Sequence, residues 1–577
     1  MTAMFRTIDE ISDGARYDLL VIGSGAAGMA AALFAAIEGR KVLLVERTEY
    51  VGGTSALSAA TTWVPNSHHS RSVNPDDSKE KVRKFLDGVV GNHSAPSMRE
   101  AFLDSAPDAI AALEANSMVK FRPYATHPDY EQQFEGATMR GRALEPVPFD
   151  GRSLGVDLDK IRPPIPEFTI FGGMMVDRTD IGHLLAIKTS ARSAVHAFKI
   201  LAHYAGDRLK GRRGSRLVMG NALIGRFLAS LKARGVEILI RTEVQDLVTE
   251  NGAVTGAILK SGATTRGVAA TNGIVLAAGG FNRHPQRRAE LLPQAATYSP
   301  SAPGHTGAMQ DIALRLGARF GEGNLDSAFW APVSIRKRAD GSTASFPHFV
   351  MDRSKPGTVC VDQTGRRFVN ESVSYHLFGR AMFEHNKQAP CIPCFIITDA
   401  VGLSKYGLGM VRMGTRKLAP YLADGYLTEG ATVADLAAKI GVPAANLETT
   451  IAAMNRYAAS GVDPDFGRGT TPYHRVNGDA SVGPNPTLGP ISTAPYYAVR
   501  LYPGDIGAAA GLVINEWAQV TRADGSAIAG LYACGNEANS IMGGTYPGPG
   551  ITIGPAITFA YRAVRHAVGA AQARRAA

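Results

Sequence analysis

The feature that most constrains the fold is a glycine-rich turn between two apolar stretches near the start of the chain. Residues 18–23 read DLLVIG, residues 23–28 read GSGAAG, and an alanine-rich helical pattern then continues to Ile37. A second apolar stretch, residues 41–46, ends in Glu46. This succession of buried strand, glycine turn, helix, strand and terminal acid is typical of a dinucleotide-binding βαβ unit.

Each position of the turn has a physical reason in that unit. Gly23 permits the tight turn, Gly25 lets the backbone approach a pyrophosphate, and Gly28 lets the helix pack against the strand. The amides at the start of the helix face the phosphates, and Glu46 accepts hydrogen bonds from a ribose. The expected dinucleotide contacts are Gly23, Ser24, Gly25, Ala26, Ala27, Gly28 and Glu46.

Chain length and composition indicate a multidomain globular protein. The chain has 577 residues, of which 45% are apolar and 19% charged, and one hydrophobic core rarely supports so many. No apolar run approaches the roughly 20 residues that span a bilayer. The polar N-terminus lacks the features of a secretory signal. We therefore expect a cytoplasmic protein.

The pattern of strands predicts an α/β fold assembled from both ends of the chain. Residues 274–280 and 531–535 are further apolar strands that end in glycine, residues 235–242 and the turn at Asn251–Gly252 suggest a β-meander, and residues 552–568 read as a final helix. Residues 281–490 differ in character. The expected architecture is a Rossmann-type domain (parallel sheet plus β-meander) formed by residues 1–280 and 491–577, with an inserted α+β catalytic domain at 281–490.

Three further motifs resemble the fumarate reductase and succinate dehydrogenase flavoprotein superfamily. They are the E-x(5)-G-G-T-S run at 46–55, VLAAGGF at 275–281 and GLYACGNEANS at 530–540. The resemblance implies FAD, with a second glycine-rich loop around it. It adds these expected FAD contacts: Arg47, Gly52, Gly53, Thr54, Ser55, Val244, Ala278, Gly279, Gly280, Gly535, Asn536, Glu537 and Ile553.

Two absences refine this expectation. No second glycine fingerprint for NAD(P)H is present, so we expect electrons to leave to a quinone-like or protein acceptor. Residues 54–59 contain no histidine where covalently flavinylated members carry one. We therefore predict non-covalent FAD.

A tyrosine stands where dicarboxylate reductases of the superfamily carry a proton-donating arginine. Residues 367–375 read RFVNESVSY, so the position falls on Tyr375. With a P-D-Y run at 128–130 and G-T-Y-P-G-P-G at 544–550, the chain resembles the 3-ketosteroid Δ1-dehydrogenases. The resemblance implies that Tyr375 is the base, that Tyr130 assists it, and that Tyr546 and Gly550 hold the substrate carbonyl.

The implied chemistry suits these residue types. Tyr546 and the Gly550 amide donate to the 3-keto oxygen and favour the enolate. Tyr375, with its pKa lowered by a hydrogen bond from Tyr130, takes the C2 proton, and the C1 hydrogen leaves as hydride to flavin N5. Three side chains are expected to form an apolar wall: Phe329, Trp330 and Met351.

Two alternative functions stay open at this point. One is another enzyme of the superfamily, such as a Δ4-ketosteroid dehydrogenase or an enoate or fumarate-type reductase. The other is a flavin-binding, membrane-associated interaction protein, because residues 184–216 carry eight lysines and arginines against Asp207 alone and repeat apolar residues at helical spacing. Such a segment suits peripheral contact with an anionic membrane, here the inner face.

Other ligand classes are disfavoured. The net charge is +10, but no nucleic-acid-binding motif appears, so we expect no nucleic acid. Cys391 and Cys394 form a CxxC without a second ligand pair. We interpret them as buried small residues and expect no metal site.

Overall fold

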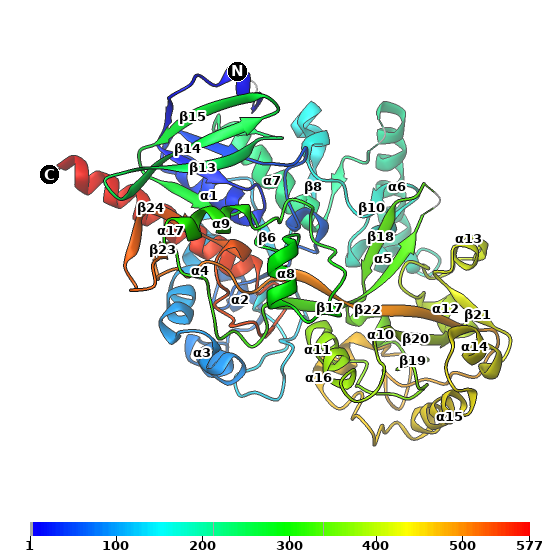
Figure 1. The fold of residues 1–577 in the computed structure, drawn as a ribbon. Coiled ribbons are helices and arrows are strands. Elements are labelled where there is room, and N and C mark those ends of the chain that lie inside the picture. The colour runs from blue at the N-terminus through cyan, green and yellow to red at the C-terminus, as the bar shows by residue number, and fades with distance from the viewer. Residues whose placement is uncertain (1–3, 212, 339, 577) are drawn as a thin grey trace.

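The computed structural model describes residues 4–211, 213–338 and 340–576 (Figure 1). Its first layer is a seven-stranded sheet in the order β1-β12-β4-β3-β16-β24-β23, parallel except for β23. Two of these strands, β23 and β24, come from the C-terminal part of the chain; the sequence predicts β24, through residues 531–535, but not β23. The strands are β1 (Phe5–Arg6), β3 (Leu19–Ile22), β4 (Val42–Val45), β12 (Glu237–Leu239), β16 (Ile274–Leu276), β23 (Gln519–Thr521) and β24 (Ala527–Ala533).

The helix after the glycine turn, α1 (Ala26–Ile37), is buried along most of its length. It packs against β3, β4 and two other helices, α7 (Met219–Ala233) and α17 (Ile553–Ala576). Gly28 shows why this contact needs glycine, because a Cβ there would lie 1.8 Å from the Gly23 carbonyl oxygen. The predicted βαβ unit is therefore present.

A four-stranded sheet in the order β13-β14-β15-β2 adjoins this layer. Asn251 and Gly252 both have positive φ and connect β13 to β14, as a two-residue hairpin requires. The meander begins later than expected, because the strand predicted at 235–242 joins the parallel sheet as β12 instead. The strands are β2 (Ala15–Tyr17), β13 (Glu243–Glu250), β14 (Ala253–Ser261) and β15 (Thr264–Ala270).

The second main sheet runs β18-β17-β22-β20-β19, with β21 also paired to β22, and lies at the lower right in Figure 1. Its strands are β17 (Ala328–Lys337), β18 (Thr343–Pro347), β19 (Thr358–Val361), β20 (Cys394–Asp399), β21 (Thr428–Gly430) and β22 (Tyr496–Ala508). The helices of residues 285–477 are α8 (Pro285–Leu291), α9 (Ala308–Arg315), α10 (Val350–Arg353), α11 (Tyr375–His385), α12 (Ala400–Tyr406), α13 (Ala419–Ala423), α14 (Val433–Ile440), α15 (Ala444–Ser460) and α16 (Pro472–Asn477).

Strand β22 complicates the expected domain division. It belongs to the 491–577 segment, yet it pairs with β17, β20 and β21 of the 281–490 segment. The boundaries drawn from the sequence therefore stay a prediction. The four cysteines are free and buried, as expected for structural small residues.

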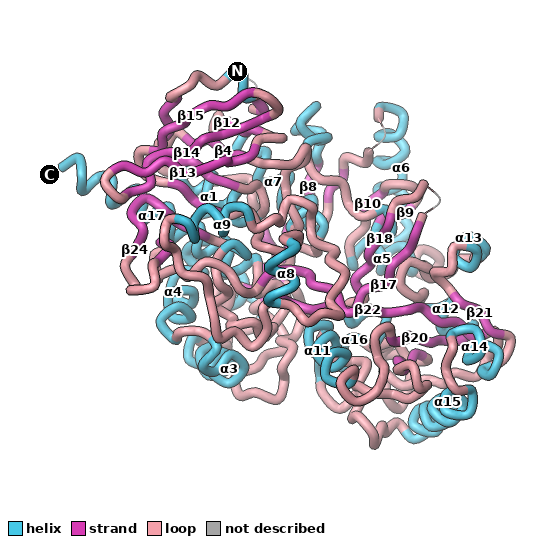
Figure 2. Tube along the Cα trace, viewed as in Figure 1, coloured by secondary structure: helices cyan, strands magenta, loops and turns pink. Residues whose placement is uncertain are grey.

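Residues 62–217 form the remaining elements, with helices α3 and α4 drawn at the lower left and α6 at the upper right in Figure 2. The small sheets are β5-β7-β6, β8 with β11, and β9 with β10. The strands are β5 (Thr62–Trp63), β6 (Phe121–Pro123), β7 (Ala143–Pro146), β8 (Phe149–Asp150), β9 (Thr169–Ile170), β10 (Met174–Met175) and β11 (Arg216–Leu217). The helices are α2 (His68–Val73), α3 (Lys79–Val90), α4 (Pro96–Asn116), α5 (Arg178–Leu185) and α6 (Ala191–Lys210).

Candidate active site

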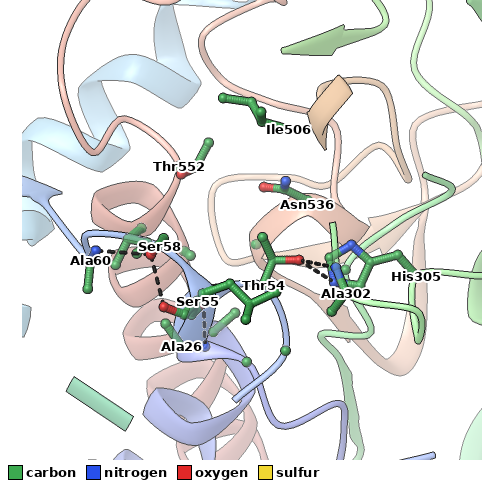
Figure 3. Close-up of a pocket in the computed structure, with 18 of the residues that line it drawn as sticks. Ala26, Thr54, Ser55, Ser58, Ala60, Ala302, His305, Ile506, Asn536 and Thr552 are labelled. Atoms are coloured by element: carbon green, nitrogen blue, oxygen red, sulfur yellow. Dashed lines mark hydrogen bonds between the residues drawn. The ribbon is translucent and has the colours of Figure 1, made fainter. Parts of the chain in front are cut away.

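A cavity of about 430 Å³ extends from the turn between β3 and α1 to the second main sheet. Its walls come from both ends of the chain and from the middle, including Gly25, Tyr375 and Ile553. Figure 3 shows the part of the wall where Thr54 lies beside Ala302 and His305, while Ser55 and Ser58 lie toward Ala26 and Ala60. One continuous cavity thus joins the predicted cofactor residues and the predicted substrate residues.

The glycine turn presents bare backbone to this cavity. Gly25 caps α1 with extended backbone, and a Cβ placed on it would meet only the Ser55 hydroxyl, at 3.8 Å. That hydroxyl accepts a hydrogen bond from the Ala26 amide at 3.1 Å (Figure 3). Gly23 has a φ of +102°, and a Cβ there would lie 2.3 Å from the Ala277 carbonyl oxygen. An open helix start beside backbone this close fits the diphosphate of a dinucleotide.

Glu46 lines the cavity and also holds its rim together. One carboxylate oxygen accepts from the Ser24 amide at 3.2 Å and the Ser24 hydroxyl at 2.6 Å. The other accepts from the Thr48 amide at 2.9 Å and the Thr48 hydroxyl at 2.8 Å. A carboxylate has about four acceptor sites, so these bonds tie the glycine turn to the next loop and compete with a ribose for the same oxygens.

The second glycine-containing loop meets a segment that sequence reasoning missed. The Thr54 hydroxyl accepts from the Ala302 amide at 2.9 Å and lies 3.3 Å from His305 Nε2 (Figure 3). Burial lowers the pKa of His305 to about 4, so its imidazole is neutral. A Cβ on Gly279 would lie 2.5 Å from His305 Nε2. A lone histidine in a loop without periodicity carries no local signal, which explains why the sequence did not single it out.

Most of the predicted cofactor residues line the cavity. The ones that do are Gly23, Ser24, Gly25, Ala26, Ala27, Glu46, Arg47, Gly53, Thr54, Ser55, Val244, Ala278, Gly279, Gly535, Asn536 and Ile553.

Four predicted residues, Gly28, Gly52, Gly280 and Glu537, are not among the residues of the cavity wall. A Cβ on Gly52 would lie 2.8 Å from the Ala56 Cβ. The buried Glu537 carboxylate accepts from the Gly280 amide at 3.2 Å, and burial raises the pKa of Glu537 to about 7. These residues hold the wall in place from behind.

Three predicted tyrosines converge at the other end of the cavity. The Tyr130 hydroxyl donates to the Tyr375 hydroxyl at 3.3 Å. The Tyr546 ring lies 5.1 Å from the Tyr375 ring and 5.8 Å from the Tyr130 ring, centroid to centroid. Phe329 and Phe349 pack against Tyr546 and Tyr375 at 5.2 Å and 4.9 Å. All five line the cavity, so the three phenols lie among apolar aromatic side chains.

The expectation that Tyr130 lowers the pKa of Tyr375 is wrong for this cavity. Burial raises the pKa of Tyr375 and of Tyr130 well above 10, and raises the pKa of Tyr546 to about 12. Desolvation penalises a phenolate more than one hydrogen bond from a neutral phenol relieves it. All three side chains are therefore neutral phenols in the cavity at neutral pH.

The motif before Tyr375 fixes its position. The Arg367 guanidinium binds the buried Glu371 carboxylate at 2.9 Å and 2.8 Å, and Arg468 reaches Glu371 at 3.2 Å. Ser374 caps α11 by accepting from the Leu377 amide. Tyr375 is the first residue of this helix. The arginine and glutamate of the motif thus anchor the loop that precedes Tyr375.

Gly550 stands in the wall with a φ of +90°, and a Cβ on it would lie 2.3 Å from the Thr61 carbonyl oxygen. Its own carbonyl accepts from the Trp63 and Gly554 amides at 3.1 Å and 3.0 Å. Within residues 4–211, 213–338 and 340–576, no backbone hydrogen bond uses the Gly550 amide. That amide is therefore available to a ligand.

The loops that carry Tyr130 and Tyr546 are tied together directly. The Tyr130 amide donates to the Pro547 carbonyl at 2.8 Å. The preceding residue, Asp129, accepts from the Trp63 indole at 2.9 Å and binds Arg142 at 2.8 Å. This buried network fixes the spacing between the two phenols.

Two of the three residues predicted to form an apolar wall do line the cavity. Phe329 and Met351 line the cavity. Trp330 does not; its ring packs 4.9 Å from Phe383, because alternation along β17 points it to the opposite face.

The structure contains one group of side chains suited to a metal ion among the residues that it describes: His68, His69 and Glu114. It lines no part of the cavity. The sequence search, which looked for separated ligand pairs, overlooked these adjacent histidines.

Comparison with known proteins identifies relatives over the full chain. Residues 18–553 match the family described as FAD binding domain. A 4-oxocyclohex-2-ene-1-carboxylate 5-dehydrogenase of Sinomonas cyclohexanicum is 36% identical, over 96% of this chain and 94% of its own length. A 3-oxosteroid 1-dehydrogenase of Mycobacterium tuberculosis is 33% identical, over 95% and 98%. A structure of 3-ketosteroid Δ1-dehydrogenase from Sterolibacterium denitrificans with 1,4-androstadiene-3,17-dione superposes with a TM-score of 0.89 at 34% identity, covering 96% of this chain and all of that one.

Proposed function

We propose that this chain, which belongs to the FAD-binding domain family, introduces a C1–C2 double bond into 3-ketosteroids. The observation that carries the proposal is that Tyr130, Tyr375 and Tyr546 converge in the same cavity that the glycine turn between β3 and α1 lines. Relatives named as 3-oxosteroid 1-dehydrogenases, and a structure of one with a steroid dienone, support the same reaction.

Cofactor and substrate would occupy the two ends of the cavity. The glycine turn, Glu46 and the Thr54 loop would hold the FAD, which supplies the acceptor, at N5, for a hydride from C1. The start of α17 at Ile553 lines the same cavity and brings the partial positive charge of a helix start to it. We propose non-covalent binding, because no histidine occurs at residues 54–59.

The tyrosines would divide the remaining work. Tyr546 and the free Gly550 amide donate to the 3-keto oxygen, which gains negative charge as the enolate forms. That donation makes the C2 hydrogen acidic. Tyr375, in its phenolate form, takes the C2 proton, while the Tyr130 hydroxyl donates to the Tyr375 oxygen and holds it in position.

The aromatic enclosure supports this chemistry in two ways. Phe329 and Phe349 exclude water from the reacting carbons and hold the rings of Tyr546 and Tyr375 in position. The same burial raises the pKa of Tyr375. A raised pKa means that few Tyr375 side chains are phenolates at neutral pH, but that each phenolate is a stronger base.

Anaerobic mixing with a panel of 3-ketosteroids tests the proposal. A substrate should bleach the yellow flavin absorbance, and the product should show two new vinyl protons, at C1 and C2, by NMR. Desaturation at C4–C5 instead would favour the Δ4-dehydrogenase alternative, and reduction of an enoate by the reduced protein would favour a reductase. A flavin that no ketone bleaches, and that when reduced passes its electrons to no enoate, would favour the interaction-protein alternative.

We also propose that helices α5 and α6 rest on an anionic membrane surface. Phe198 and Leu185 are 72% and 66% exposed, and Lys188, Arg192 and Lys199 are exposed beside them. Apolar side chains among cations suit a lipid interface. None of the described helices is both long and apolar enough to cross a membrane.

The structure corrects part of the charge pattern on which this contact was predicted. Arg213 points inward and donates to the carbonyls of Leu158 and Ile161 at 2.9 Å and 2.7 Å. Arg216 pairs with the buried Asp180 at 2.7 Å. Arg212 lies outside the described residues. Co-sedimentation with vesicles containing anionic lipid, against neutral vesicles, tests the contact; equal binding to both would contradict it.

A further inference from the structure

We infer that Arg178 binds an anionic group at the far end of the substrate, so that the preferred substrate is a 3-ketosteroid whose side chain carries a carboxylate. This inference rests on the proposed function and specifies its substrate class. The observation behind it is an arginine that lines the substrate end of the cavity without an acidic partner.

Arg178 lies at the rim of the substrate end. It is the first residue of α5, it is exposed, and it lines the cavity. Its guanidinium carbon lies 5.9 Å from the centre of the Tyr124 ring, and its side chain contacts the Met351 sulfur at 3.8 Å. Tyr124 and Met351 line the cavity too. The guanidinium is therefore presented where a bound molecule reaches solvent.

The acidic residues Glu145 and Asp177, near Arg178, are already paired with another arginine. Arg122 binds Glu145 at 2.6 Å and Asp177 at 3.4 Å. No carboxylate lies within ion-pair distance of Arg178 among the residues that the structure describes. Its charge is therefore left for a ligand, and guanidinium groups bind carboxylates in a two-pronged geometry.

The other arginines of the cavity lie at the cofactor end and have partners. Arg47 pairs with Glu243 at 2.8 Å. Arg162 donates to the Thr48 hydroxyl at 2.9 Å and lies 5.6 Å from the Tyr50 ring. Arg178 differs from both in its position beside the substrate residues.

Neighbouring groups experience the uncompensated charge. Burial lowers the pKa of His127, a cavity residue, to about 3, and Arg178 contributes to the shift. Burial also lowers the pKa of Lys355, with Arg178 again contributing. Because the His127 imidazole is neutral, the positive charge at this end of the cavity is that of the Arg178 guanidinium, which favours an anion.

A single loop connects Arg178 to the reacting centre. Tyr124 contacts Arg178 at one end of the 124–130 segment, and Tyr130 donates to Tyr375 at the other. A substrate whose ketone lies at Tyr546 would extend along this loop, so that its distal end meets Arg178.

The test compares one steroid in two charge states. A 3-ketosteroid with a carboxylate-terminated side chain and its methyl ester differ in one charge, and kcat/KM is measured for both without detergent. Wild type should favour the acid by about tenfold, as expected for a partly exposed charge-assisted contact, and added salt should reduce the preference. Arg178→Gln should raise KM for the acid alone, and Arg178→Lys should keep part of the preference. Arg16→Gln, at an exposed arginine on β2, should change kcat/KM for neither substrate.

The outcomes separate this inference from the proposed function. Equal kcat/KM for acid and ester in wild type, or an equal loss of both in Arg178→Gln, overturns the subsite while leaving the dehydrogenase in place. If neither compound is oxidised, the proposed function fails. Titration of the flavin spectrum with the acid then decides the subsite by itself: a Kd unchanged by Arg178→Gln would reject it, and a Kd raised about tenfold would support it.

Discussion

The hydroxyl of Tyr130 donates a hydrogen bond to the hydroxyl of Tyr375 across 3.3 Å, although 245 positions separate the two residues in the chain. Tyr375 begins a helix that is anchored by buried ion pairs, and Tyr130 follows Asp129, which Trp63 and Arg142 hold. Two separately braced loops thus bring the phenols together.

Removing the hydroxyl of Tyr375 should abolish dehydrogenation. Tyr375→Phe keeps the ring contacts with Phe349 and Tyr546, so FAD content and steroid binding should stay near wild type. Loss of a general base should lower kcat by roughly 10²–10⁴-fold. Stopped-flow flavin reduction measures the effect, and a rate within a few-fold of wild type would remove Tyr375 from the mechanism.

The raised pKa of Tyr375 predicts an alkaline pH profile. The active form is the phenolate, whose population grows about tenfold per pH unit below the pKa, and burial places that pKa above 10. kcat/KM should therefore rise with pH and reach no plateau below about pH 10. A plateau that begins near neutral pH would contradict this assignment.

Glu46 should matter to the architecture of the cofactor loop as well as to the cofactor. Glu46→Ala frees the donors of both Ser24 and Thr48, so it should lower the flavin-to-protein ratio after gel filtration. Glu46→Gln keeps one acceptor oxygen and should retain more FAD. Ser24→Ala, which removes one of the two tethers, serves as the control. Flavin content equal to wild type in Glu46→Ala would show that the carboxylate neither tethers the loop nor contacts the cofactor.

The flavin should leave the protein when the fold is destroyed. Residues 54–59 offer no histidine for a covalent link, so acid precipitation should release yellow cofactor into the supernatant. Colour that remains in the pellet after washing would refute non-covalent binding.

Local rules predicted the βαβ unit that carries the glycine turn. The glycine turn, the strand before it and Glu46 obey constraints that operate within about 30 residues, and the structure has them where the sequence places them. Residues 235–242 show the limit of such rules: the run is a strand, but its neighbour in the sheet is β4, nearly two hundred residues earlier. Pairing between distant strands leaves no trace in the strand's own sequence.

The substrate half depends on burial, which a sequence motif does not encode. The motif placed Tyr375 correctly beside Tyr130, yet the direction of the pKa shift was wrong, because it follows from the desolvated surroundings of the phenol. His305 and Arg178 also line the cavity, although no sequence motif indicated either residue. Their roles come from what the tertiary fold places, or fails to place, next to them.

The proposed hydrogen bonds from Tyr546 and Gly550 to the substrate carbonyl provide the most selective test of ketone activation. If Tyr546 donates to the 3-keto oxygen, its hydroxyl contributes more as the ketone becomes an enolate than when the ketone binds. Tyr546→Phe should therefore lower kcat by more than it raises KM. The loss should be roughly 10²-fold or more, the magnitude for one lost oxyanion donor.

Two controls accompany the Tyr546→Phe test. Gly550→Ala should act by displacement, because a Cβ there would lie 2.3 Å from the Thr61 carbonyl oxygen; it should raise KM and lower kcat together. A matched 3-hydroxysteroid should fail with wild type, since an alcohol forms no enolate. If that alcohol is dehydrogenated in the ring at a comparable rate, or if Tyr546→Phe changes KM alone, the phenol does not activate the ketone, and the tyrosine cluster loses its proposed role in catalysis.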